Sequence, residues 1–407
     1  MRRVTAVLLL LAMACTQPSV PSPSPSQAST ISPTAPAAAT SPPTSSPTNP
    51  FGIVQAFPLG GLRGDWVFAL RETQVPNNGG VRVELLAMPL GDNTPRVALS
   101  FEQPAGGVNF PFPNGIASQL SPDGHRIALG VEGRSRGGEL VVVDLQRGTV
   151  QSLGEGVLPV WGSSQRIAFQ RRHPTDVYGP GTSWLIDPAG SAPTRIVDDA
   201  IPLAWHNDAL VVKVSGGIEI RVPADSRAGL PFPMTLDNVP VGERPASDLA
   251  QSGVTALAAA TVEGGYATAV HRIEVVSTPG AGSRETVTSA TGTYVEVRFA
   301  EPRWNPNPDV LQILYRRDGT RGHEVHVVDM QTKRDVVATV VGTARRAEWT
   351  PDGEQIVYIA DLRTAEFPGT QVRSIRPISG RDDRLLMASD PGLTSWFRDL
   401  ATFRYPP

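Results

Sequence analysis

The chain has 407 residues, a formal net charge of −3, 18% charged residues and 40% hydrophobic residues. So small a net charge argues against nucleic acid as a partner, and the single cysteine excludes an intramolecular disulfide and a cysteine metal cluster. The 39 glycines and 39 prolines indicate many turns rather than long helices.

Residues 1–14 have the pattern of a secretory signal peptide. Two arginines follow Met1, and the apolar run from Val4 to Met13 is too short to span a bilayer. The stretch Leu11-Ala-Met-Ala-Cys15 resembles a bacterial lipobox, which implies cleavage before Cys15 and a diacylglycerol on its sulfur. The alternative is an ordinary signal peptide in which Cys15 plays no part. Either leader predicts a protein outside the cytoplasm, periplasmic or on the cell surface.

Residues 15–50 are almost entirely Pro, Ser, Thr and Ala after the cysteine. Such a segment has no apolar surface to bury and is expected to stay disordered, partly as polyproline II. We interpret it as a tether that holds a folded domain, residues 51–407, away from a membrane.

One turn motif organises the folded part of the chain. The stretch Leu120-Ser-Pro-Asp-Gly-His-Arg-Ile-Ala-Leu-Gly130 returns as Trp349-Thr-Pro-Asp-Gly-Glu-Gln-Ile-Val-Tyr-Ile359. In both copies Pro, Asp and Gly are typical of a tight turn, and the alternating apolar run that follows predicts a strand. The repeated unit is therefore predicted to be strand, tight turn, strand.

The large apolar residue before this turn recurs at spacings of 41 to 55 residues. Its positions are Leu120, Trp161, Trp205, Leu249, Trp304, Trp349 and Trp396. A period of about 40–50 residues is that of one four-stranded propeller blade. We therefore predict an all-β fold, a β-propeller of four-stranded antiparallel blades, with seven blades expected and six or eight as alternatives.

The last segment, Trp396 to Arg404, looks like the first two strands of a further unit. A ring must pair its first and last blades or leave an open edge. We expect this segment to close the ring beside the N-terminal strands near Ile53 or Trp66.

Two repeats also indicate a family. Leu120-Ser-Pro-Asp-Gly124 with Ile127, and Trp349-Thr-Pro-Asp-Gly353 with Ile356, resemble the WD40-like repeats of TolB-type β-propellers. The other repeats lack the complete Pro-Asp-Gly signature. The resemblance implies the propeller fold and a scaffold role in the cell envelope, but no partner-binding motif carries over to this chain.

The sequence contains no nucleophile elbow, phosphate loop or dinucleotide fingerprint, so we predict no catalytic residue and no cofactor. We also predict no metal site. His323 and His326 lie three apart on a strand and point to opposite faces. Asp123 and Asp352 are expected to cap their turns rather than to bind calcium. The repeated tryptophans are expected to pack between blades rather than to stack on sugars.

Loops that join the second and third strands of each blade fall on one face of a propeller. In this chain they carry ten Lys or Arg residues, Arg71 and Lys213 among them, and seven Asp or Glu residues. This excess predicts a mildly cationic recognition face, with ordinary solvated loops as the alternative. The candidate binding residues are Arg134, Arg136, Arg171, Arg172, His173, Tyr178, Arg316, Arg317, Arg321 and Arg363.

These patterns favour a monomeric, membrane-anchored, extracytoplasmic propeller that binds a protein or an acidic glycan of the cell envelope and catalyses no reaction. Two alternatives remain open. One is a lyase or hydrolase acting on an anionic glycan, with acid–base groups among His173, Asp176, Tyr178 and Arg317. The other is a sensor that holds a small ligand in the central channel.

Overall fold

A computed structural model gives the fold. The chain divides into two units, Met1–Thr48 and Asn49–Pro407. The residues described are 54–75, 80–92, 94–103, 115–132, 138–162, 165–171, 181–190, 192–206, 209–214, 217–221, 230–231, 256–265, 268–277, 284–293, 296–320, 322–338, 341–362, 369–377, 379, 382–390 and 395–406. The predicted leader, Cys15 and the tether therefore lie outside the described residues.

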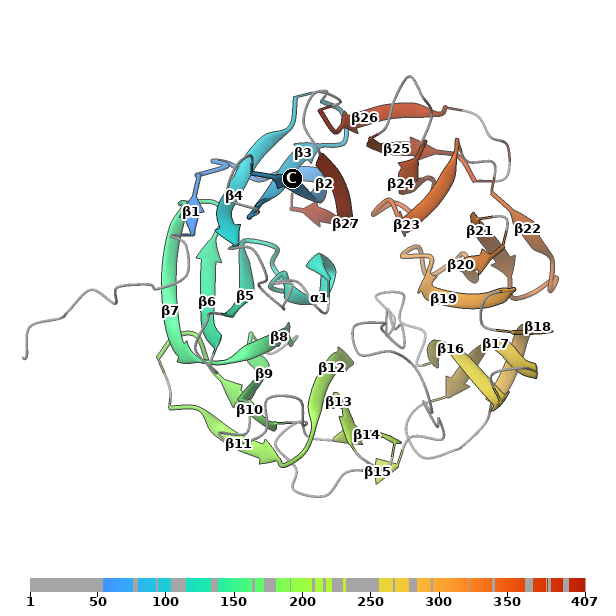
Figure 1. The fold of residues 1–407 in the computed structure, drawn as a ribbon, viewed down its shortest axis with the longest axis horizontal. Coiled ribbons are helices and arrows are strands. Elements are labelled where there is room, and N and C mark those ends of the chain that lie inside the picture. The colour runs from blue at the N-terminus through green and yellow to red at the C-terminus, as the bar shows by residue number, and fades with distance from the viewer. Residues whose placement is uncertain are drawn as a thin grey trace, which may run out of the picture. The chain divides into compact units, whose positions relative to one another are not determined.

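Within the second unit, the described strands form seven antiparallel sheets that follow one another in chain order about a common centre (Figure 1). Sheet 1 contains β27 (Ser395–Tyr405), β2 (Gly64–Gln74), β3 (Val81–Pro89), β4 (Arg96–Gln103) and β1 (Gln55–Ala56). Sheet 2 contains β5 (Arg126–Glu132), β6 (Gly138–Asp144) and β7 (Thr149–Glu155).

Sheets 3 and 4 have four described strands each. Sheet 3 contains β8 (Val157–Trp161), β9 (Ile167–Arg171), β10 (Thr182–Ile186) and β11 (Thr194–Val197). Sheet 4 contains β12 (Ile201–His206), β13 (Ala209–Val214), β14 (Gly217–Arg221) and β15 (Leu230–Pro231).

The remaining sheets complete the arrangement. Sheet 5 contains β16 (Ala256–Gly265), β17 (Thr268–Ser277) and β18 (Arg284–Gly292). Sheet 6 contains β19 (Val297–Trp304), β20 (Gln312–Gly319), β21 (Gly322–Asp329) and β22 (Asp335–Val337). Sheet 7 contains β23 (Thr343–Trp349), β24 (Ile356–Asp361), β25 (Thr370–Ile375) and β26 (Arg384–Ala388). The all-β propeller prediction is confirmed, whereas the blade number stays a prediction.

The last strand closes the arrangement, as predicted. β27 pairs antiparallel with β2, and Trp66 lies opposite Phe403. The prediction of two strands in this segment was wrong, because β27 is one continuous strand of 11 residues with no Gly or Pro to turn it. Trp396 stands at its start, whereas Trp161, Trp304 and Trp349 end their strands, so Trp396 does not share their repeat position.

The first turn motif also differs from its prediction. A short helix, α1 (Ile116–Gln119), precedes Leu120 where a strand was expected. The Ile116 backbone N–H donates to the Asp399 carboxylate at 2.6 Å, and Leu120 makes only an isolated bridge to Ile127. The segment before Leu120 is thus bonded to Asp399 of β27, and it does not form the hydrogen-bonded strand that was expected beside β5.

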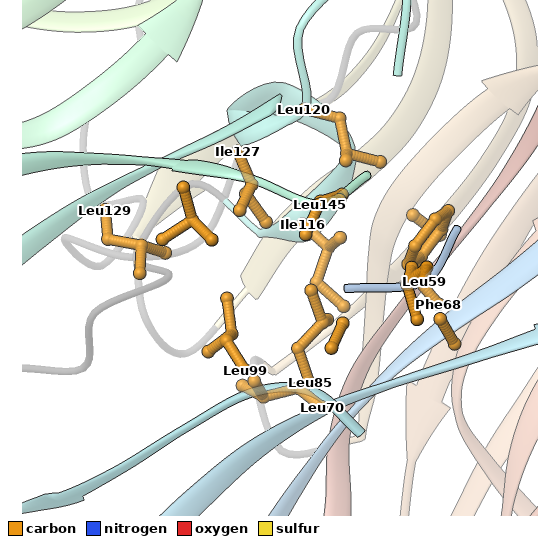
Figure 2. Packing of buried hydrophobic residues seen from close by; sticks show 14 of the residues in the cluster. Leu59, Phe68, Leu70, Leu85, Leu99, Ile116, Leu120, Ile127, Leu129 and Leu145 are labelled. Carbon is orange, nitrogen blue, oxygen red and sulfur yellow. The ribbon is translucent and has the colours of Figure 1, made fainter. Parts of the chain in front are cut away.

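A hydrophobic cluster fills the space between sheets 1 and 2. Figure 2 shows Phe68 and Leu70 of β2, together with Leu85 of β3, on the side that meets Ile127 of β5 and Ile116 of α1. Leu59, from the segment before β2, is also buried in this cluster. Sheets 1 and 2 therefore share one apolar layer. Its side chains come from alternate residues of each strand, which is the period-two pattern that predicted the strands. In the part of the chain that the structure describes, no helix is long and apolar enough to cross a membrane.

Candidate functional site

Two neighbouring inner strands carry charge-swapped copies of one short motif. β19 ends in Glu301-Pro-Arg-Trp304, and β23 ends in Arg346-Ala-Glu-Trp349. The Nη1 atom of Arg346 lies 2.5 Å from Oε1 of Glu301. The Nε atom of Arg303 lies 3.0 Å from both oxygens of Glu348, and these side chains are 1% and 8% exposed. Two ion pairs thus join sheets 6 and 7.

The ion pairs continue into the closing strand. The Nε atom of Arg346 lies 2.7 Å from Oδ1 of Asp399 in β27, without the alignment of a hydrogen bond. The Nη1 atom of Arg316 lies 3.2 Å from Oε1 of Glu301. The inner charge cluster is defined as Glu301, Arg303, Arg316, Arg346, Glu348 and Asp399. It joins sheets 6, 7 and 1, whose inner strands face the centre in Figure 1.

The arginines hold the carboxylate of Glu301 in the ionised form. Burial alone would raise the pKa of Glu301, but the charges of Arg316 and Arg346, together with that of Arg303, outweigh it and lower the pKa to about 2. Burial would also raise the pKa of Asp318, but the hydrogen bonds from His323 and Arg316 outweigh burial and lower this pKa to about 2. A carboxylate ionised throughout the physiological range cannot act as a general acid, so the cluster fits a structural role.

The predicted recognition face is described only in part. Arg171, Arg316 and Arg317 lie among the described residues. The other candidates lie outside them and stay predictions: Arg134, Arg136, Arg172, His173, Tyr178, Arg321 and Arg363.

Arg316, a candidate for the recognition face, is held by acids of the same chain. Its side chain is 15% exposed, and its Nε atom lies 2.6 Å from Oδ1 of Asp318. Arg317 is exposed, because successive residues of β20 point to opposite faces of the sheet. Lys213, near the end of β13, is half-buried. Neither Lys213 nor Arg317 has a carboxylate partner among the described residues.

Arg171 ends β9 and packs on aromatic rings. Its Cζ atom lies 4.5 Å from the centroid of the Trp184 ring and 5.7 Å from that of Phe169. Its Nε–H donates to the carbonyl of Glu155 at 3.2 Å. We define the cationic rim as Arg171, Lys213 and Arg317, which lie at or near the ends of second strands that lead to third strands.

Two acids counted on the same face are already neutralised. Glu72 accepts from Nε of Arg398 at 2.8 Å, and Asp361 accepts from Nη2 of Arg345 at 2.6 Å. Both acidic side chains are 7% exposed, and both arginines come from inner strands that the sequence count did not include. Two of the counted cations are paired in the same way, Arg71 with Glu84 and Arg316 with Asp318, so ion pairs reduce both the acids and the cations available on this face.

The turn aspartates cap their turns, as predicted. Oδ1 of Asp123 accepts from the hydroxyl of Ser121 at 2.5 Å and from the backbone N–H of His125 at 3.0 Å. The second copy repeats both bonds through Asp352, Thr350 and Glu354. Gly124 and Gly353 have φ of 68° and 74°, a conformation that glycine adopts without strain. Among the described residues, no three His, Cys, Asp or Glu side chains are placed to hold a metal.

The repeated tryptophans pack between sheets, which confirms their prediction. Nε1 of Trp205 in sheet 4 donates to the carbonyl of Val160 in sheet 3 at 3.0 Å. Nε1 of Trp349 in sheet 7 donates to the carbonyl of Arg303 in sheet 6 at 3.2 Å. The two histidines have different partners: Nδ1 of His323 lies 2.7 Å from Asp318, whereas Nδ1 of His326 lies 3.1 Å from Asp335.

No family model and no curated protein matches this chain. Solved structures do. An acylaminoacyl peptidase from Pyrococcus horikoshii matches with a TM-score of 0.52 and 14% identity over 84% of this chain and 53% of that chain. The chain is a β-propeller.

Two further structures are similar to this chain. TolB from Acinetobacter baumannii has a TM-score of 0.45 and 13% identity over 83% of this chain and 66% of that chain. A periplasmic gluconolactonase from Pseudomonas aeruginosa has a TM-score of 0.45 and 11% identity over 84% of this chain and 100% of that chain. The propeller fold that the resemblance to TolB-type repeats implied is confirmed. The propeller spans about half of the peptidase chain, and at these identities the likeness shows the fold alone.

Proposed function

We propose that the propeller is an extracytoplasmic lipoprotein that binds an envelope partner through the face carrying the cationic rim. One observation carries the proposal: the acids of the inner charge cluster are held by arginines, whereas the rim cations Lys213 and Arg317 have no described carboxylate partner. The described geometry therefore supports recognition rather than acid–base turnover.

Affinity capture tests the binding. The full mature chain, used as bait in solubilised envelopes, should retain a partner that a double variant, R171S/R317S, retains poorly. Arg316 is left intact because its loss would leave Glu301 and Asp318 short of a cation. The control is R147S/R334S, since both arginines are exposed and lie in loops between third and fourth strands, at the opposite ends of the strands. Equal capture by the double variant and the full chain would contradict the proposal.

The anchor has its own test. If Cys15 carries lipid, the chain should incorporate labelled fatty acid and remain with membranes, and Cys15→Ser should release it to the soluble extracytoplasmic fraction. If the unaltered chain takes up no label and both chains are found in the soluble extracytoplasmic fraction, the ordinary signal peptide is favoured instead.

A further inference from the structure

We propose that Arg171 is a preorganised carboxylate-binding subsite that recognises an Asp or Glu side chain of an acidic peptide segment. The inference deepens the proposed function and rests on it, because it names the chemistry of the partner that the cationic rim would bind.

The guanidinium of Arg171 is held in place by two aromatic rings and a backbone carbonyl. The Trp184 ring lies against Arg171 at 4.5 Å and the Phe169 ring at 5.7 Å, while the carbonyl of Glu155 takes the Nε–H. None of these contacts uses the two Nη groups. Within the described residues the outer N–H groups have no hydrogen-bond partner. A guanidinium whose stem is held in this way matches the two oxygens of a carboxylate, and little side-chain entropy is left to lose on binding.

A second cation, Lys213, lies on the same face as Arg171. Lys213 lies on β13 of the next sheet, at the same end of the strands. Elsewhere on the same face, Glu72 of sheet 1 and Asp361 of sheet 7 are engaged by Arg398 and Arg345. A bound carboxylate would therefore meet net positive charge along the described part of the rim.

The tryptophans favour a peptide over an acidic glycan. Sugar rings stack on open indole faces, but Trp66, Trp161, Trp304 and Trp349 are at most 5% exposed. The half-buried indoles Trp184, Trp205 and Trp396 have Arg171, Arg166 and Arg398 over their rings. No described tryptophan presents an open platform for a sugar, so the recognition expected here is of carboxylates alone.

Calorimetric titration of the full mature chain with a synthetic ten-residue poly-glutamate peptide tests the subsite. We expect salt-sensitive binding that R171Q weakens about tenfold or more, because a bidentate charge-assisted contact is lost. R171K keeps the charge but loses the planar fork, so it should also bind more weakly than the full chain. The control R147Q, a 79% exposed arginine at the other end of the strands, should bind like the unaltered chain.

Several outcomes would overturn the assignment. These are equal affinity of R171Q and the unaltered chain, full rescue by R171K, or tighter binding of an oligogalacturonate of matched charge than of the peptide. Circular dichroism and the thermal midpoint of each variant establish that it folds. If R171Q captures the envelope partner as the full chain does, the subsite fails while the proposed function stands. If the full chain binds the peptide but captures nothing, the proposed function fails instead.

Discussion

The same backbone position carries charge on one side of the propeller and apolar side chains on the other. Glu301 of β19 and Leu158 of β8 each stand three residues before a repeated tryptophan, and their φ angles are 55° and 53°. Both lie where the pairing register of an inner strand shifts, as at a β-bulge. Glu301 is ion-paired across the sheet boundary, whereas sheet 3 reads Leu158-Pro-Val-Trp161 with no charge at all.

The comparison shows that the repeat determines where a side chain is placed and the individual sequence determines what it does there. A positive φ occurs at this position with a charged residue, Glu301, and with an apolar one, Leu158, so the bulge does not require the ion pair. The charged side contains the junction between sheet 7 and β27, where Arg346 meets Asp399. We infer that the ion pairs favour correct closure by the last strand, since an apolar contact would be less selective for its partner.

The strongest test breaks the charged side alone. Arg346→Met leaves Glu301 and Asp399 without their shared cation, and removing one partner of a buried pair costs about 3–5 kcal/mol of unfolding free energy. Leu158→Met, at the same position on the apolar side, should cost less than about 1.5 kcal/mol. Urea unfolding measures both. Equal losses would mean that the ion pairs add nothing to closure.

Acid should weaken the charged side next. Glu301 has a folded-state pKa of about 2 against an ordinary 4.5, so its stabilisation is complete above pH 4.5 and is lost as the pH falls toward 2. This group contributes on the order of 3 kcal/mol. Glu301→Gln should therefore be less stable than the unaltered chain at pH 6, and its stability should fall less between pH 5 and pH 3. Parallel pH profiles in urea unfolding would contradict the lowered pKa.

A smaller effect is expected at the turn where sheets 6 and 7 meet. A Cβ at Gly353 would lie 1.9 Å from Oδ1 of the buried Asn305, whereas a Cβ at Gly60 would meet nothing within 4 Å. Both have positive φ, so Gly60→Ala measures the backbone strain, about 1–2 kcal/mol. Gly353→Ala should lower the unfolding free energy by about 1–3 kcal/mol more, because the side chains overlap. Similar losses in both variants would show that Asn305 can move aside.

The smallest difference separates two tryptophans at equivalent positions. Nε1 of Trp349 donates to the carbonyl of Arg303, but Nε1 of Trp161 has no hydrogen-bond partner among the described residues. Replacement by Phe removes similar apolar area at both, and only Trp349→Phe also loses a hydrogen bond. It should cost about 1 kcal/mol more than Trp161→Phe in thermal unfolding. The reverse order would argue against the bond between sheets.

Much of the blade could be predicted locally. The Pro-Asp-Gly turns, the second strands and the inter-sheet role of the tryptophans follow from period-two patterns and turn chemistry that operate within about ten residues. The inner charge cluster was missed, although Glu301-Pro-Arg-Trp304 and Arg346-Ala-Glu-Trp349 display it as opposite charges at matching positions. Aligning the repeats on their tryptophans would have revealed the pairing of sheets 6 and 7.

By itself, the sequence determined the turns, the strands, the blade-length period and the charges available at each repeat position, because these depend on neighbours along the chain. Only the tertiary structure decided that β27 is a single strand beside β2, that α1 replaces a strand, and that Arg316 is half-buried in ion pairs while Arg317 is exposed. The physical reason is that alternation shows two adjacent side chains facing opposite ways, but the packing of distant segments decides which of them is covered.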